Sequence, residues 1–317
     1  MTTLITGIGL VGTSFARYAL ERRENLVFYD FQPRTNYLTS KLGNQDITVV
    51  QKDIRDLPGL IEVIQDNNID TVVHTAGLIG NKVSTPLYSG LQINVMGMIN
   101  VLEAVRLTGV KRLVHISSFG VYDGRCTKNH PVSESEALGP GRAYGNSKVV
   151  KELLAETYQL EFGFELIMLR VANVYGLGHF WGGSGGGEKI QNLLKAGIRG
   201  ETAEIPQNQT MDFEYVYCCD VGRAVDLAAT IPMPDQTIMN IGTGLITPFE
   251  KLVTIAQEVL PKLKVKIIPG QPPAVSSKQP LEISRAEKYL EWKPAYDMRS
   301  GLCEYIEDLK VAMKSNE

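Results

Sequence analysis

The sequence predicts a doubly wound α/β fold, a parallel sheet covered by helices on both faces, and three observations support this prediction. Short apolar runs alternate with amphipathic stretches through the first half of the 317-residue chain. The runs have apolar residues at successive positions, which is typical of parallel strands buried on both faces. A glycine-rich turn also joins the first run to the first amphipathic stretch, as expected where such a strand passes into a helix.

The expected strands alternate with helices along the chain, and this order requires right-handed crossovers within one parallel sheet. Strands are predicted at residues 4–6, 26–30, 47–50, 71–74, 112–116, 166–170 and 238–241. Helices are predicted at residues 12–23, 57–67, 91–108, 144–162, 188–196 and 249–260. The alternation ends after Tyr175. We therefore expect a first domain over residues 1–175 and a smaller, mainly substrate-covering domain over 176–317, with a late strand and helix within about 213–245 returning to the first.

Composition narrows the class of protein. Hydrophobic residues make up 44% of the chain and charged residues 21%, with a net charge of −3. This balance argues against a nucleic-acid groove or a basic membrane-binding face. The strand pattern starts at once, leaving no room for a signal peptide, and no apolar run is long enough for a transmembrane helix. None of the four cysteines has metal-ligand spacing. We expect a cytoplasmic protein with a small-molecule substrate, no metal, and no nucleic-acid or membrane partner.

The glycine-rich turn has the spacing of the Rossmann dinucleotide fingerprint. Its glycines permit a tight turn, close approach of a pyrophosphate, and close helix packing, while the helix N-terminus offers free N–H groups to phosphate. The expected contacts are Gly7, Gly9, Leu10, Val11 and Gly12. Asp30 ends the next strand, where a carboxylate binds ribose hydroxyls and repels a 2′-phosphate. The sequence therefore predicts NAD, with NADP less favoured although Arg34 is close.

Further cofactor contacts are expected where later strands end, because ligands of such sheets lie beyond the carboxyl ends of the strands. Asp53 and Ile54 follow the third strand, and Asp53 could hydrogen-bond adenine. Ala76 and Gly77 follow the fourth strand, where small side chains let a cofactor approach the backbone. Ordinary turn chemistry explains each of these residues equally well.

Tyr144 and Lys148 lie one helical turn apart, so an ammonium can sit beside a phenol and lower its pKa. A tyrosine tuned in this way can exchange a proton with a substrate hydroxyl. The same spacing occurs at Tyr37–Lys41 and Tyr289–Lys293, which are expected to be structural. Only Tyr144 follows a strand that ends in hydroxyl residues, Ser117–Ser118. Tyr144, Lys148 and Ser118 are therefore the predicted catalytic set.

At this point the chain resembles the extended short-chain dehydrogenase/reductase family, which includes NAD-dependent sugar epimerases and dehydratases. The resemblance covers nearly the whole length. The motifs that carry it are Thr6–Gly12, Asp53–Ile54, His74–Gly77, Asn94–Gly97, Ser117–Tyr122, Tyr144–Lys148 and Arg170–Gly176.

The resemblance implies roles for individual residues. Tyr144 would be the acid/base, Lys148 would bind the nicotinamide ribose and depress the tyrosine pKa, and Ser118 would hydrogen-bond the reacting oxygen. Asn94 would support the adjoining strand and cofactor site, although a helix-entry cap is equally plausible, and Ser117 joins the cofactor contacts. Asn173 would mark the substrate pocket. Family members also commonly form homodimers through a four-helix bundle, here from helices at 91–108 and 144–162.

The chain departs from the family's pattern in three places. The glycine loop has one residue fewer between its first two glycines than most extended members. Sugar dehydratases carry an Asp-Glu pair directly after the catalytic hydroxyl residue, whereas this chain has Phe119 and Gly120, so dehydration is not expected. Nucleotide-sugar relatives place an arginine where this chain has Phe213 or, in another register, Met211, so the substrate is expected to lack a nucleotide diphosphate unless other groups hold it.

His179 and Trp181, in a glycine-dense stretch, are expected either to stack on a sugar as a lid or to lie in an ordinary surface loop. With Ser118, Phe119 and Asn173 they complete the predicted substrate contacts. The sequence thus predicts reversible hydride transfer at a secondary alcohol of a sugar, with an epimerase favoured by the family. The alternatives are a dehydrogenase of a non-nucleotide sugar, polyol or small alcohol, and a non-catalytic NAD-binding regulator.

Overall fold

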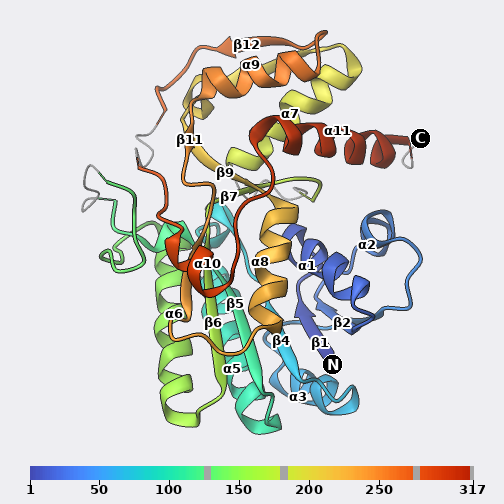
Figure 1. The fold of residues 1–317 in the computed structure, drawn as a ribbon, viewed down its shortest axis with the longest axis vertical. Coiled ribbons are helices and arrows are strands. Elements are labelled where there is room, and N and C mark those ends of the chain that lie inside the picture. Colours follow the sequence, from blue (N-terminus) through green and yellow to red (C-terminus); the bar gives the residue numbers. More distant parts are fainter. Residues whose placement is uncertain (125–129, 179–184, 274–278, 315–317) are drawn as a thin grey trace.

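Seven parallel strands form the central sheet of the computed structural model, which describes residues 1–124, 130–178, 185–273 and 279–314. Their order across the sheet is β10-β6-β5-β4-β1-β2-β3. The strands are β1 (Thr2–Thr6), β2 (Asn25–Asp30), β3 (Thr48–Gln51), β4 (Thr71–His74), β5 (Arg112–Ser118), β6 (Glu165–Val171) and β10 (Ile238–Ile241). The order reverses between β1 and β4, the switch point where such sheets bind ligands. The predicted doubly wound α/β fold is confirmed (Figure 1).

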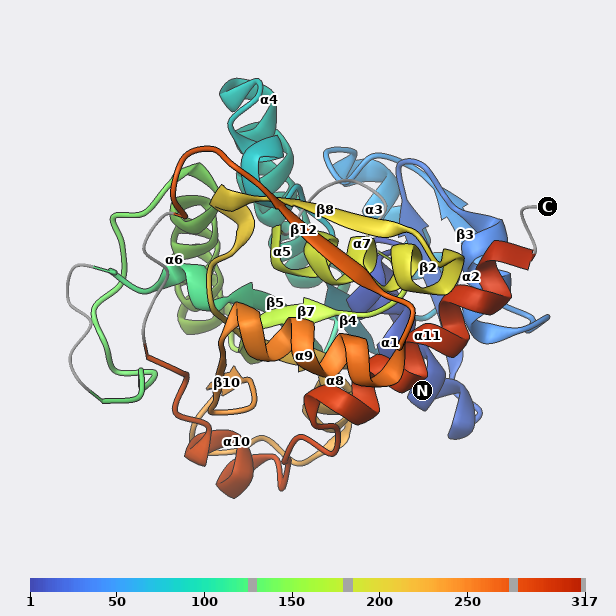
Figure 2. The same cartoon turned by 90° about the horizontal axis from the view of Figure 1, so that it is seen from above.

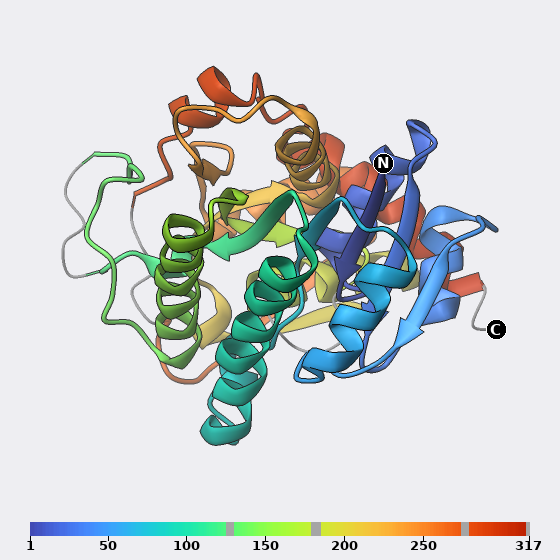
Figure 3. The same ribbon diagram turned by 90° about the horizontal axis from the view of Figure 1, so that it is seen from below.

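Helices cover both faces of the sheet, so apolar side chains at successive strand positions are buried on both sides. Successive residues of β1 pack in the two hydrophobic clusters on opposite faces of the sheet. Leu4 lies in one cluster and Ile5 in the other, and both are fully buried. The sheet helices are α1 (Leu10–Glu21), α2 (Thr35–Leu42), α3 (Leu57–Asp66), α5 (Gly97–Thr108), α6 (Ala143–Phe162) and α8 (Cys218–Thr230). Seen from below, the light-blue, teal and green helices (α3, α5 and α6) cover one face (Figure 3), and α1, α2 and α8 pack on the other.

Two small sheets lie beyond the carboxyl ends of the central strands (Figures 1 and 2). The first contains β7 (Asn173–Tyr175), β9 (Phe213–Tyr217) and β11 (Ile246–Thr247), and the second β8 (Thr202–Pro206) and β12 (Lys264–Ile268). The helices with them are α7 (Gly185–Arg199), α9 (Phe249–Val259) and α11 (Met298–Lys314). Within the late segment, α8 packs on α1 and β10 joins the central sheet, whereas β9 does not.

The helix predicted at 91–108 is interrupted. Its parts are α4 (Leu87–Leu91), a π-helical turn (Gln92–Met96) and α5. Gly90 approaches the preceding chain so closely that a Cβ there would lie 2.0 Å from the carbonyl oxygen of Val83. The helical region therefore begins at Leu87, four residues before the start that the apolar pattern predicts. α4 projects from the body of the protein (Figure 2). In the described part of the chain, no helix is both long and apolar enough to cross a membrane.

Candidate active site

The start of α6 brings the predicted catalytic residues together at the carboxyl end of β5. A Cβ on Gly145 would lie 2.3 Å from the carbonyl oxygen of Gly120, so only glycine lets α6 pack this closely. A Cβ on Gly120 would in turn lie 3.4 Å from Ser118 Oγ and 3.8 Å from Tyr144 Cε1. Ser118 Oγ also accepts a hydrogen bond from the Gly120 N–H at 3.1 Å. Ser118 and Tyr144 therefore share one site, on either side of Gly120.

Lys148 lies beneath this site but does not reach the phenol. Its Nζ donates to the carbonyl oxygen of Ile116 at 2.6 Å and lies 5.9 Å from the centroid of the Tyr144 ring. Burial raises the pKa of Tyr144, and the Ser118 hydrogen bond opposes that rise. Burial also lowers the pKa of Lys148 to about 8, while Glu152 opposes that shift. Lys148 Nζ is thus bonded to a backbone carbonyl rather than to the Tyr144 hydroxyl, and its effect on the tyrosine pKa stays a prediction.

The other two Tyr–Lys spacings have structural surroundings. The Tyr37 and Thr13 hydroxyls are 2.9 Å apart in the core. Lys41 forms a 2.5 Å ion pair with Asp308. In the segment Tyr289–Lys293, the helix α10 (Ser284–Tyr289) ends at the tyrosine. Neither pair meets a strand-end hydroxyl as Tyr144 meets Ser118.

The glycine loop between β1 and α1 fits a pyrophosphate. Gly7 has φ +93°, a conformation that favours glycine, and a Cβ on Gly12 would lie 2.7 Å from the Gly7 carbonyl oxygen. Gly9 differs, since a Cβ there meets nothing within 4 Å. Gly9 is also the N-cap of α1, without a side-chain cap or an acidic residue in the first turn. Leu10 and Val11, the first two helical residues, have backbone N–H groups without an intrahelical partner, as a phosphate requires.

Asp30 lies against the same loop. Its Oδ2 accepts from the Ile8 N–H at 2.6 Å, and its Oδ1 accepts from the Gln32 N–H at 2.8 Å. The carboxylate is half-buried at the end of β2. A ribose bound beside the loop meets this negative charge, so the geometry fits NAD better than a cofactor with a 2′-phosphate.

The predicted adenine contact is engaged elsewhere. The Asp53 carboxylate accepts from Arg55 Nε at 3.0 Å and from its terminal nitrogen at 2.6 Å. These hydrogen bonds lower the pKa of Asp53. Ile54 is buried and packs on α5, where a Cβ on Gly97 would lie 2.8 Å from its Cγ2. The side chain of Ile54 is therefore a packing residue, and Asp53 is fixed by its neighbour.

Asn94 fastens the loop that follows β4. Its Oδ1 accepts from the Leu78 N–H at 2.7 Å, and its Nδ2 donates to the Leu78 carbonyl at 3.0 Å and to Ser147 Oγ at 3.1 Å. Gly77, with φ +153°, lies against the same amide. Asn94 thus holds the segment after Ala76 against the catalytic helix, and it sits inside the π-helical turn rather than at a helix-entry cap.

The hydroxyl of Ser117 points into a buried network rather than toward a free site. It donates to Glu152, which also receives a 2.7 Å ion pair from Arg170. Arg170 and Glu152 are both about 2% exposed. The predicted cofactor contact of Ser117 can therefore come only from its backbone. This network could not be predicted from the sequence, because it depends on how α6 packs against β6.

A second missed feature is a group of buried bases behind the cofactor loop. His74 and His115 face each other across β4 and β5, with ring centroids 5.4 Å apart. Lys151, 1% exposed, has a single described hydrogen bond, a long one of 3.4 Å to the Ala76 carbonyl. Burial, and then Lys148, hold the pKa of Lys151 well below its usual range. The only sequence signal of Lys151 is a charge one turn beyond Lys148.

Lys151→Met is expected to stabilise the protein. An unfolded lysine keeps its proton up to a pKa of ~10.4, and the folded protein binds that proton more weakly, at a cost of about 1.4 kcal/mol per unit of depression. The free energy of unfolding in urea should therefore rise by more than about 1 kcal/mol near pH 7. The gain should shrink as pH rises toward ~10, because the unfolded lysine then loses its proton as well. Lys264→Met, at an exposed site, is the control; an equal or smaller gain for Lys151→Met would contradict the depressed pKa.

The predicted substrate contacts lie at the same edge of the sheet. Phe119 opens the short helical turn after Ser118 and is half-buried. Asn173 starts β7, and its Nδ2 donates to the Glu214 carbonyl at 3.3 Å. His179 and Trp181 lie outside the described residues.

Near Met211 and Phe213, where the family pattern places an arginine, the structure contains a different cation. Lys189 Nζ, from α7, donates to the carbonyls of Gln209 and Met211 at 2.9 Å each and lies 5.1 Å from the centroid of the Phe213 ring. Lys189 is fully buried, and burial lowers its pKa to about 8. The position of Lys189 could not be predicted from the sequence, because no residue spacing indicates that α7 packs beside β9.

The sheet, the glycine loop and the Ser–Tyr–Lys set define a dinucleotide-dependent short-chain dehydrogenase/reductase. The sequence profile of the NAD dependent epimerase/dehydratase family matches residues 3–242. The chain belongs to this family, and NAD is its cofactor, as the sequence predicted.

Three relatives illustrate the range of the family. The putative UDP-glucose 4-epimerase of Methanocaldococcus jannaschii is 30% identical, covering 98% of each chain. UDP-glucuronic acid decarboxylase 6 of Arabidopsis thaliana is 26% identical over 99% of this chain and 90% of that protein. The structure of MoeE5 in complex with UDP-glucose and NAD superimposes with a TM-score of 0.81 at 26% identity, covering 99% of this chain and 100% of the other.

Proposed function

We propose that this chain is an NAD-dependent sugar epimerase or oxidoreductase that transfers a hydride reversibly at a secondary alcohol of a sugar or sugar derivative. The observation that carries the proposal is the contact of Ser118 and Tyr144 across Gly120, at the sheet edge that also holds the glycine loop. NAD, when bound, would supply the acceptor for the hydride that leaves the substrate carbon. The substrate contacts are proposed from Ser118, Phe119 and Asn173, with residues 176–317 mainly covering the substrate.

Each of the three catalytic residues has a separate role in the proposed reaction. Tyr144, as phenolate, takes the hydroxyl proton while the C–H bond breaks and the C=O bond forms. Ser118 donates a hydrogen bond to the developing carbonyl oxygen, in the manner of an oxyanion-stabilising donor. Lys148 neutralises charge near the phenolate when the proton is absent. When the hydride and the proton return to the substrate, the same steps run in reverse. Oxidation and reduction therefore use one set of residues.

The net reaction depends on what happens to the ketone. If it turns over within the site and is reduced on its other face, the result is epimerisation; if it leaves, the result is dehydrogenation. Epimerisation is supported by the family and by the Methanocaldococcus jannaschii relative, a putative UDP-glucose 4-epimerase. The second candidate, dehydrogenation of a sugar without a nucleotide, is favoured by Met211 and Phe213, which offer no guanidinium fork.

Dehydration is not part of the proposal, although the family contains dehydratases and decarboxylases. Water elimination needs a further acid and base beside the catalytic hydroxyl residue. Phe119 and Gly120 occupy those positions, and neither side chain transfers a proton.

A screen of sugars, free and nucleotide-linked, tests the proposal with the purified NAD-loaded protein. Turnover without net NADH accumulation indicates epimerisation, whereas substrate-dependent, stoichiometric NADH release indicates dehydrogenation. Binding of NAD without turnover of any sugar in the screen would favour the non-catalytic regulator instead.

We also propose that the protein is a homodimer, in which α4, α5 and α6 pair with the same helices of a second copy. These helices carry exposed apolar side chains, as a helical interface requires. They are Leu87, Tyr88, Leu91, Met96, Leu107, Val150, Leu153, Leu160 and Phe162. A cytoplasmic location stays a prediction.

Leu153→Glu is expected to convert the dimer into a monomer, because it places a charge within the proposed interface. The control is Ile267→Glu on β12, whose residue is similarly exposed, at 50% against 53%. Analytical ultracentrifugation of the wild type and both variants measures the effect. A monomeric wild type, or a dimer that survives Leu153→Glu, would contradict the proposed interface.

A further inference from the structure

A polar pocket lies away from the active site, between α10 and the segment that precedes β10. It has a volume of about 470 Å³ and is lined by Gln236, Ser284, Arg285, Lys288 and Tyr289. We call it the α10 pocket. Its size falls in the range of ~300–1,000 Å³ typical of small-molecule sites. Its lining contains two cationic side chains and no carboxylate.

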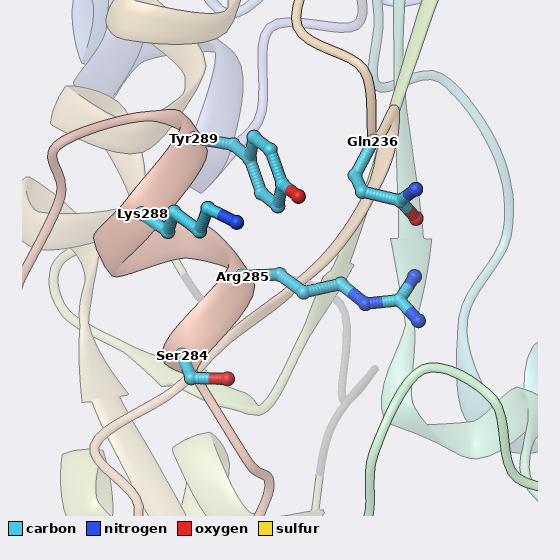
Figure 4. Close-up of a pocket in the computed structure, with 5 residues that line it drawn as sticks. All are labelled: Gln236, Ser284, Arg285, Lys288 and Tyr289. Atoms are coloured by element: carbon cyan, nitrogen blue, oxygen red, sulfur yellow. The ribbon is translucent and has the colours of Figure 1, made fainter.

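The donors of the lining converge on one space. Figure 4 shows the Lys288 ammonium, the Tyr289 hydroxyl and the Gln236 amide around the cavity, with the Arg285 side chain extending from α10 toward Gln236. Lys288 Nζ lies 4.7 Å from the centroid of the Tyr289 ring, a cation–π contact that restrains the ammonium. Among the described residues, Lys288 and Gln236 have no hydrogen-bonded or ion-paired side-chain partner.

A buried carboxylate orients the arginine. Arg285 Nε lies 3.3 Å from Glu134 Oε2, and the Glu134 side chain is 1% exposed. The other oxygen of Glu134 accepts from the Asn240 N–H at 2.8 Å, which fixes the carboxylate in place. This anchor uses the Nε side of the guanidinium, and its two terminal nitrogens have no partner among the described residues. The fork formed by these nitrogens matches the spacing of two oxygens on one anion.

The α10 pocket is separate from the catalytic site. Strand pairing aligns Ile238 of β10 with Met168 of β6, and Met168 with His115 of β5. Gln236 lies two residues before Ile238, and Ser118 lies three residues after His115. Along the strand direction the two residues are therefore five positions apart, and β10 is two strands away from β5. Ordinary strand spacings make this separation roughly 16 Å along the strands and 10 Å across them.

We propose that the α10 pocket binds the phosphate group of a small phosphorylated molecule. Arg285 grips two phosphate oxygens, Lys288 neutralises the remaining charge, and Gln236 and Tyr289 donate to the oxygen that faces β10. The buried Glu134 acts as a positioning residue that holds the guanidinium for the ligand. This inference does not depend on the reaction at Tyr144.

Calorimetric titration of the NAD-loaded protein with inorganic phosphate at low ionic strength tests the proposal. NAD fills the phosphate site at α1, so saturable binding is expected at the α10 pocket. Lys288→Met should weaken that binding about tenfold, the loss expected for a charge-assisted hydrogen bond. Lys288 is chosen because replacing Arg285 would leave Glu134 buried without its cation.

Lys293→Met is the matched control. Lys293 is an exposed lysine of the same region that pairs with Glu287 and does not line the pocket. It removes the same charge, so a nonspecific electrostatic effect would weaken binding equally in both variants. Equal weakening, or absence of saturable phosphate binding in the wild type, would overturn the proposal.

Discussion

Tyr144→Phe is expected to lower kcat by a factor of about 10²–10⁴, the usual contribution of a positioned acid/base. The variant keeps the aromatic ring that packs on Gly120 and removes only the hydroxyl that exchanges the proton. NAD binding should change little, because the glycine loop and Asp30 hold the other end of the cofactor. Steady-state turnover on the substrate found in the sugar screen measures the effect.

The control for this variant is Tyr158→Phe, which removes a hydroxyl from the same helix at a distance from the site. Its turnover should equal that of the wild type. If Tyr144→Phe retained wild-type turnover while the protein remained folded, Tyr144 would not be the acid/base.

The second large effect is expected in the glycine loop, where two neighbouring glycines should fail in different ways. Gly12→Val places a Cβ 2.7 Å from the Gly7 carbonyl, so it should destabilise the cofactor-free protein by about 1–3 kcal/mol. Gly9→Val meets no protein atom within 4 Å, so its stability should stay at the wild-type value or rise slightly. The open space at Gly9 is the proposed path of the pyrophosphate, and NAD affinity should therefore fall more than tenfold.

Urea unfolding without NAD and titration with NAD separate the two effects. The fit of the loop to the cofactor would be wrong if Gly9→Val bound NAD as tightly as the wild type. The packing argument would be wrong if Gly12→Val were as stable as the wild type.

Elements that are buried on both faces could be predicted well from sequence. The runs at Leu4–Thr6 and Leu166–Arg170 have apolar residues at successive positions, which only a strand covered twice requires. β8 and β12 could not be predicted, because they pair across sixty-two residues, Thr202 with Lys264, and β8 buries only alternate side chains. The early start of the helix region near Gly90 depends on a backbone contact that spacing does not encode.

The active site divides in the same way. Tyr144, Ser118 and the glycine loop could be predicted because local spacing and strand ends determine their chemistry. The partner of Lys148 could not, since its bond to Ile116 depends on how α6 crosses β5. The surroundings of Lys151 and Lys189 likewise arise from tertiary packing between distant segments, and burial then sets their pKa values.

The most direct test of the proposed hydride transfer is the absorbance of reduced nicotinamide after substrate is mixed rapidly with the NAD-loaded protein. The account predicts a rise in this absorbance that is slower when deuterium replaces hydrogen at the reacting carbon, and that is nearly absent in Tyr144→Phe. For an epimerase the rise should be followed by a fall as product forms. Product formation without any reduction of the bound NAD, and without a deuterium effect, would contradict it.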